Sequence, residues 1–86
     1  MILVDAAIWP HDGRTWAHLV SDRDYDELHE FAQRLGIPRR GFHGDHYDVP
    51  TEWRERAIEM GAVSVSSREL LRRLRDAGLR RSRRGA

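Results

Sequence analysis

The sequence predicts a small α/β domain: a sheet of three or four strands with three packed helices, in a single compact unit. Helical stripes of apolar residues alternate with short β-rich runs, and capping residues and glycines bracket each helix. The length of 86 residues suits one domain. We expect the order strand, strand, helix, extended segment, helix, strand, helix. The domain should span residues 1–79, followed by a basic tail at 80–86 that we expect to be disordered.

Two strands are expected near the start of the chain. Ile2–Val4 is short and wholly apolar, as in a strand covered on both faces. Trp16–Val20 alternates, which places Trp16, His18 and Val20 on one side. His11-Asp12-Gly13 is expected to form the turn between these strands.

The first helix is expected at Asp24–Leu35. Asp24 can cap it, and Glu27 completes a capping-box pattern. Gly36 supplies the left-handed position at its end, and Pro38 prevents continuation.

The second and third helices are bounded in the same way. The second spans Thr51–Met60, with Thr51 as its cap and Gly61 as its stop. Ser66 caps the third helix, which Gly78 ends. Between them, Ala62–Val65 should be a strand parallel to its neighbour. Residues 41–49 fit either an extended segment or a functional loop.

Charge is distributed unevenly along the chain. Residues 1–67 hold seven arginines against twelve acidic residues, a balance of −5, whereas residues 68–86 hold eight against two, a balance of +6. Such a basic end could bind nucleic acid or a nucleotide, or dock on the acidic face of a second copy, giving a homo-oligomer.

Composition excludes some classes of protein. The chain contains no cysteine, which rules out disulfides and thiolate metal ligands. Its longest initial apolar run, Met1–Val4, is far shorter than the roughly 20 residues of a membrane span. We therefore expect a cytoplasmic protein with no membrane partner and no secretory signal.

Several uncommon residues occur in a distinctive order and spacing along the chain. The segments are Val4-Asp5-Ala6, Ile8-Trp9-Pro10, Gly13-Arg14-x-Trp16-x-His18-Leu19, Asp26-Glu27-Leu28-His29-x-Phe31-Ala32-x-x-Leu35-Gly36, His46-Tyr47-Asp48-Val49, Gly61-Ala62-Val63 and Val65-Ser66-Ser67-Arg68-Glu69-Leu70. In these segments the chain resembles DUF4031, a family of small bacterial and phage domains of unknown function. The resemblance covers residues 2–75 and implies a family and no activity. Ala6 departs from the pattern, because the family is associated with a second acid after Asp5.

The segment from His43 to Asp48 is the densest group of chemically useful side chains. His43, His46 and Asp48 could hold a divalent metal such as Zn²⁺, Mn²⁺, Fe²⁺ or Mg²⁺, with help from His18 or Asp5. His46 and Asp48 leave the same face of an extended segment, which also suits a general-base histidine with an orienting carboxylate. A solvated polar loop, in which Tyr47 packs, is the plainer interpretation.

His18 and Asp5 are further candidates for catalysis. His18 shares its side of the strand with Trp16 and Val20, so it is either a core histidine or a residue at the exposed end of the sheet. Asp5 follows the first strand, where open α/β sheets place their ligands, although an aspartate there often only binds a loop.

Candidate ligand contacts lie at a helix start and in the arginines. Ser66, Ser67 and Arg68 could bind an anion, or could serve only as a cap with a surface arginine. Arg39 and Arg40 could contact a nucleic-acid backbone or remain solvated. Tyr47 is a further candidate ligand contact. Trp9, Trp16 and Trp53 could stack bases, but tryptophan in so small a domain is usually core.

Three functional hypotheses follow. The leading one is a phosphate-ligand site for a nucleotide or nucleic acid, with metal-assisted hydrolysis as its catalytic form. It places Asp5, His18, His46, Asp48, Ser66 and Arg68 at one corner. The alternatives are a non-catalytic nucleic-acid-binding or adaptor module and a self-associating structural protein.

Overall fold

The central element of the fold is β3 (Arg14–Ser21), the longest strand. In the computed structural model, which describes residues 1–81, β4 (Tyr47–Pro50) pairs antiparallel with one edge of β3. Its other edge pairs antiparallel with β2 (Trp9–His11) and β1 (Ile2–Val4), and β1 pairs in parallel with β5 (Val63–Ser64). The α/β domain is thereby confirmed, with a sheet of five strands rather than three or four.

Strand β2 is the element that the sequence did not predict. Its three residues are exposed, and Pro10 interrupts them. Proline has no amide hydrogen to donate, so it is tolerated in an edge strand. Strand β2 lies at an edge of the sheet. The expected turn before β3 is therefore tighter, at Asp12-Gly13, where both residues have positive φ.

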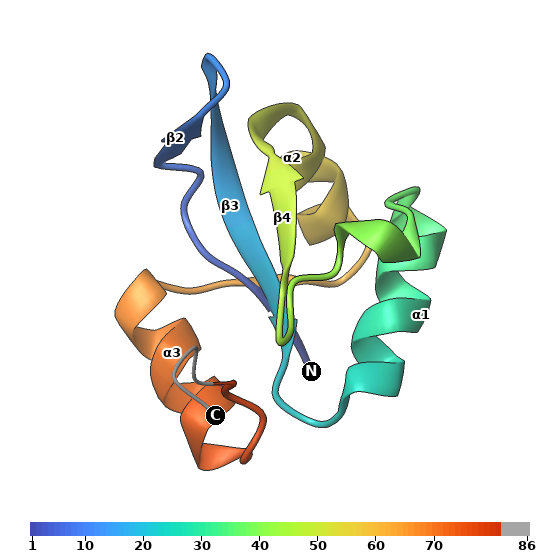
Figure 1. Cartoon of the computed structure of the whole chain (residues 1–86), viewed down its shortest axis with the longest axis vertical. Coiled ribbons are helices and arrows are strands. Elements are labelled where there is room, and N and C mark those ends of the chain that lie inside the picture. The colour runs from blue at the N-terminus through green and yellow to red at the C-terminus, as the bar shows by residue number, and fades with distance from the viewer. Residues whose placement is uncertain (82–86) are drawn as a thin grey trace.

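Helices cover the two faces of the sheet unequally. Helices α1 (Tyr25–Leu35) and α2 (Thr51–Glu59) pack on one face, and α3 (Ser67–Asp76) packs on the other (Figure 1). A short 3₁₀ helix, η1 (Arg39–Gly41), follows α1. None of the helices within residues 1–81 combines the length and apolar character needed to cross a membrane.

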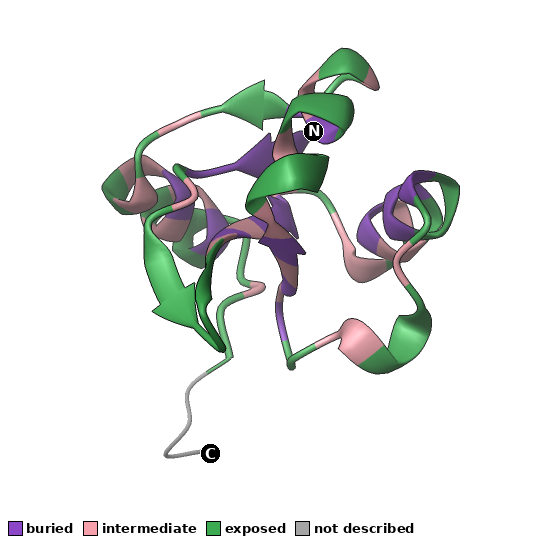
Figure 2. Ribbon diagram, turned by 90° about the horizontal axis from the view of Figure 1, so that it is seen from above, coloured by how far each residue is buried: buried purple, intermediate pink, exposed green. Residues whose placement is uncertain are grey.

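The core follows the alternation of the strands. The larger cluster joins the sheet to α1 and α2, and its members include Ile2, Val4, Ala17, Leu19, Leu28, Phe31, Leu35, Tyr47 and Val49. On the opposite face, Leu3 and Val20 form a smaller cluster with Leu70 and Leu74 of α3, against which Val65 and Leu79 also pack. Buried residues accordingly gather in the sheet and on the helix sides that face it (Figure 2).

The helix caps agree with the predictions except in α2. Asp24 accepts a hydrogen bond from the Glu27 amide, and Ser66 accepts one from Glu69. Thr51 was expected to cap α2, but Pro50 holds that position. Thr51 is the first helical residue, and its hydroxyl donates instead to the Thr15 carbonyl.

Candidate functional site

One half of the sheet face that carries α3 is left open. Trp16 and His18 of β3 point to this face, as do Asp48 and Pro50 of β4, because alternate residues of a strand share a side. His18 and Asp48 are directly opposed in the antiparallel register. Their β-carbons are therefore about 5 Å apart, close enough for both side chains to reach one point.

The ring of His18 is held from behind by Asp5. The Asp5 carboxylate accepts hydrogen bonds from the His18 backbone amide at 2.7 Å and from the Ser67 hydroxyl at 2.9 Å. It also lies 2.9 Å from Nδ1 of His18. Asp5 is fully buried, and Arg54 donates to its carbonyl oxygen at 2.7 Å. With Nδ1 engaged, the Nε2 atom of His18 is the one left for chemistry.

His46 is held in the same manner by its neighbour Asp45. Nδ1 of His46 lies 2.7 Å from Oδ1 of Asp45, which is 3% exposed. Adjacent side chains can meet here because the chain turns: the His43 amide donates to the His46 carbonyl, and Gly44 adopts φ +74°. A positive φ of this kind favours glycine.

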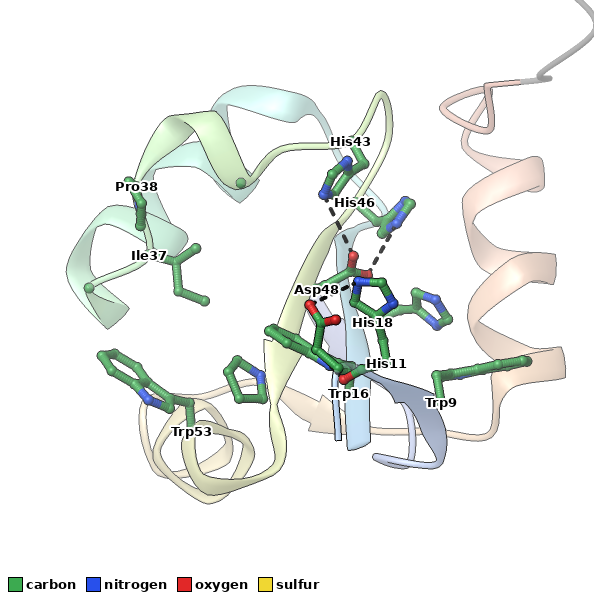
Figure 3. Close-up of a pocket in the computed structure, with 14 residues that line it drawn as sticks. Trp9, His11, Trp16, His18, Ile37, Pro38, His43, His46, Asp48 and Trp53 are labelled. Atoms are coloured by element: carbon green, nitrogen blue, oxygen red, sulfur yellow. Dashed lines mark hydrogen bonds and ion pairs between the residues drawn. The ribbon is translucent and has the colours of Figure 1, made fainter. Parts of the chain in front are cut away.

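The two histidines converge on Asp48. His18, His46 and Asp48 each offer one ligand atom, and these atoms all lie within 4.8 Å of one another (Figure 3). Nε2 of His46 is 3.4 Å from Oδ1 of Asp48. His43, expected as a third metal ligand, lies beside this group, with its Nε2 3.6 Å from Oδ2 of Asp48. We refer to His18, His46 and Asp48 as the triad.

The electrostatics of the triad favour a charged His46–Asp48 pair. Burial lowers the pKa of His46, but its hydrogen bonds to Asp48 and Asp45 outweigh that effect and raise the pKa above 6.5. The hydrogen bond from His46 lowers the pKa of Asp48. Burial raises the pKa of Asp5, yet its bonds to His18 and Ser67 leave that pKa below the usual value.

A cavity of about 750 Å³ opens beside the triad. All three tryptophans line it, together with His11, His43, Ile37, Pro38 and Pro50. The expectation that the tryptophans form the core is wrong: Trp9 is 44% exposed, Trp53 is 36% exposed, and Trp16 is partly buried. Trp9 also stacks obliquely on His18, with ring centroids 5.2 Å apart.

The cavity wall near Trp53 depends on Gly36. This residue ends α1 with φ +104°, and a β-carbon at its position would lie 3.0 Å from Cζ3 of the Trp53 indole. Figure 3 shows Trp53 on the side of the cavity away from Trp9.

The remaining residues predicted as ligand contacts lie apart from the triad. Ser66 caps α3, and Arg68 is exposed on the same helix. Arg39 and Arg40 are exposed in η1. Tyr47 points to the opposite side of the sheet, where it is buried and its hydroxyl lies 2.8 Å from Nδ1 of His29.

Two residues next to the triad have contacts that the sequence did not assign to them. Asp45, rather than Asp48, holds Nδ1 of His46. In the sequence, the only signal for this contact was Gly44, because glycine favours a turn and a turn lets adjacent side chains meet. Ser67 was expected to bind an anion, but its hydroxyl donates a hydrogen bond to the Asp5 carboxylate. No local pattern links residues 62 positions apart.

Comparison with protein families agrees with the resemblance. The model of DUF4031, described as a protein of unknown function, matches residues 2–77. No curated protein and no solved structure matches the chain. Because the match spans most of the sequence, the chain belongs to the DUF4031 family.

Proposed function

We propose that this protein is a metal-dependent hydrolase of phosphate esters, in which His18, His46 and Asp48 bind one divalent ion. The observation that carries the proposal is the pair of carboxylate-bound histidines. Asp5 and Asp45 engage the two Nδ1 atoms, and the remaining ring edges lie within reach of Asp48. A histidine that binds metal usually donates its other ring N–H to such a carboxylate.

The spacing also supports a metal. Bonds of about 2.0–2.2 Å to nitrogen and oxygen place neighbouring ligands roughly 3–3.5 Å apart. The atoms of the triad lie within 4.8 Å, so rotations that move each by about an ångström suffice to bind an ion. An ion would also neutralise the carboxylates that surround this site.

The donor set favours particular ions. Two imidazoles with one carboxylate suit Zn²⁺, Mn²⁺ or Fe²⁺ better than Mg²⁺, which prefers oxygen ligands. Three protein ligands leave coordination positions open, as in catalytic rather than structural zinc sites. An ion held by His18, His46 and Asp48 would supply Lewis-acid chemistry and would lower the pKa of a bound water towards about 7.

The surrounding residues can complete hydrolysis. The reaction adds the oxygen of water to phosphorus, breaks the ester P–O bond and returns a proton to the leaving oxygen. His43 lies next to Asp48 with a side chain that is 59% exposed, so it can deliver that proton.

The cavity favours an ester with an aromatic group, such as a nucleotide. Trp9, Trp16 and Trp53 offer indole faces on which a base could stack. A cavity of about 750 Å³ falls within the usual range for small-molecule sites. No arginine is among the described residues that line it, which leaves charge neutralisation of the phosphate to the ion.

Metal titration tests the first half of this proposal. Metal-free protein is titrated calorimetrically with Zn²⁺ and Mn²⁺. We expect one ion per chain, and at least 100-fold weaker binding in His46→Ala and Asp48→Ala. His11→Ala is the control, because this exposed histidine lines the same cavity and lies outside the triad. Equal affinity in all variants would exclude the site.

Hydrolysis tests the second half. Nucleotides and bis(p-nitrophenyl) phosphate are incubated with the protein, with and without the ion that binds. We expect turnover that follows metal occupancy and disappears in His46→Ala. If the protein binds metal tightly but hydrolyses none of these phosphate esters, the metal site is retained and the hydrolase is rejected.

The exposed tryptophans favour a second candidate, a non-catalytic nucleic-acid-binding module. Stacking on Trp9 and Trp53 needs no metal, whereas the hydrolase does. Titration with a labelled single strand at several salt concentrations, with and without a chelator, separates the two. Nucleic-acid binding that is unchanged by the chelator and by His46→Ala would favour the non-catalytic module.

A further inference from the structure

The residues that follow α3 turn back towards the triad. Gly78 has φ +75°, and the next amide, that of Leu79, donates to the Leu74 carbonyl at 3.0 Å. The Leu79 side chain packs against the cluster of Leu3, Val20, Leu70 and Leu74. The chain is therefore held against the body of the protein where the basic tail was expected to begin. Arg80 and Arg81 are described, and residues 82–86 lie outside the described part.

Helix α1 holds this segment from a second side. The Tyr25 hydroxyl donates to the Leu79 carbonyl, and Nε of Arg81 donates to the same hydroxyl oxygen at 3.0 Å. The Arg81 guanidinium also lies 5.3 Å from the centre of the Tyr25 ring. Such cation–π contacts add to the anchoring.

The third anchor is the buried carboxylate of Asp45. Its Oδ2 accepts a hydrogen bond from the Arg81 backbone amide at 2.8 Å and a longer one from Arg80 Nη1 at 3.4 Å. Its Oδ1 contacts Nδ1 of His46 at 2.7 Å. One carboxylate thus links residue 81 to a member of the triad.

We propose that Leu79–Arg81, which we call the strap, positions His46 for metal binding by fixing the carboxylate of Asp45. A backbone amide is a rigid donor, and a carboxylate held at one oxygen presents the other at a fixed angle. Without that donor, Asp45 would be a buried and incompletely bonded carboxylate, which is costly. It would reorient, and the ring of His46 would turn with it. This proposal rests on the proposed metal site.

A pair of substitutions at one position tests the role of the amide. Arg81→Pro removes the N–H that Asp45 accepts, whereas Arg81→Ala keeps it and removes the side chain. Loss of outer contacts to a metal ligand typically weakens binding by about 10–100-fold. We expect that loss of Zn²⁺ affinity in Arg81→Pro, and a change of less than about threefold in Arg81→Ala. Equal affinities in the two variants would overturn the proposal.

A double-mutant cycle shows whether the strap acts through Asp45. In an Asp45→Asn background, Arg81→Pro should have no further effect on Zn²⁺ affinity, because an amide cannot accept hydrogen bonds from both the Arg81 N–H and the His46 Nδ1–H at its two ends. Additive losses would mean that the strap acts elsewhere. Near-UV circular dichroism checks that each variant is folded. If Arg81→Pro is not, Arg80→Ala replaces it in the cycle, with an expected loss of about threefold that also vanishes in Asp45→Asn.

A metal-free measurement separates failure of the strap from failure of the proposed function. In wild-type protein, NMR should show a downfield, exchange-protected Nδ1–H resonance of His46, because that hydrogen is shared with buried Asp45. The resonance should persist in Arg81→Ala and disappear in Arg81→Pro. Its persistence in folded Arg81→Pro would reject the strap, whatever the protein does with metal.

Discussion

The hydroxyl of Ser67 donates a hydrogen bond to the carboxylate of Asp5 at 2.9 Å, although 62 positions separate the two residues. This bond joins the first turn of α3 to the end of β1. The same carboxylate binds the backbone and the ring of His18. Asp5 therefore connects the structural role of α3 to the orientation of the triad.

Asp5→Asn should impair both stability and metal binding. The amide group would point an N–H at donors that now bind a carboxylate, leaving buried groups unsatisfied at a cost of about 1–3 kcal/mol. Zn²⁺ affinity should fall by about 10–100-fold. Urea unfolding and calorimetric titration measure the two effects. Asp26→Asn, the same change at an exposed position of α1, should alter neither appreciably.

The pH dependence of the metal-free protein should be set in part by His46. Its raised pKa means that protonation stabilises the folded state, and this contribution is complete below the unfolded value near 6.5. Stability should decline as the pH rises through the raised folded pKa. Zn²⁺ binding should show the reverse trend, because the ion displaces the proton. The stability trend should be weaker in His46→Gln, as followed by thermal unfolding from pH 5.5 to 8.5, and titration of the wild-type protein over the same range follows Zn²⁺ binding.

Glu27 should stabilise the fold in a different pH range. Burial raises its pKa, but hydrogen bonds from the Ser21 hydroxyl and the amino terminus lower it below 4.5. Its contribution is present above the unfolded pKa and is lost as the pH falls through the lowered folded value. Glu27→Gln should lower the free energy of unfolding by about 1 kcal/mol at pH 7. The difference in stability from wild type should disappear at acidic pH. Glu30→Gln, at an exposed position of the same helix, serves as the comparison.

Gly36→Ala should destabilise the protein more than Gly61→Ala does. Both glycines have φ above +100°, so both substitutions strain the backbone by about 1 kcal/mol or more. Only at position 36 does the new methyl group also meet the Trp53 indole; at position 61 the space is open. In chemical unfolding, Gly36→Ala should therefore have a lower free energy of unfolding than Gly61→Ala. A shift in tryptophan fluorescence should accompany the first substitution alone.

Trp53→Leu should weaken nucleotide binding and leave metal binding intact. The indole lines the cavity but lies outside the triad. Loss of one stacking surface costs about 1–3 kcal/mol per base, equivalent to roughly a 5- to 150-fold weaker complex. Equilibrium dialysis with a radiolabelled nucleotide measures the loss. Unchanged nucleotide affinity would exclude the cavity as the base site.

The sequence was most informative where side-chain direction follows from strand alternation. Alternation alone placed His18 on the face of Trp16 and Val20, and the spacing of His46 and Asp48 put both on one side. The position after the first strand identified Asp5. The structure brings these four residues together as expected, whereas their chemical roles remain predictions.

Other contacts depend on tertiary structure that no local pattern encodes. The Asp45–His46 contact arises from a tight turn, and the Ser67–Asp5 contact from the packing of α3 across the sheet. The tryptophans were misplaced for a related reason. Composition gives their average burial, but the extent of α3 decides that the half of the sheet face with Trp9 and Trp16 stays uncovered, and Trp53 is exposed on α2 at the other side of the sheet.

Gly36 gives two parts of the molecule a common dependence. It ends α1 in a conformation that other residues adopt poorly, and its missing side chain leaves room for the Trp53 indole. The end of α1 and the position of Trp53 in the cavity wall therefore depend on the same residue. A larger side chain at position 36 would change both.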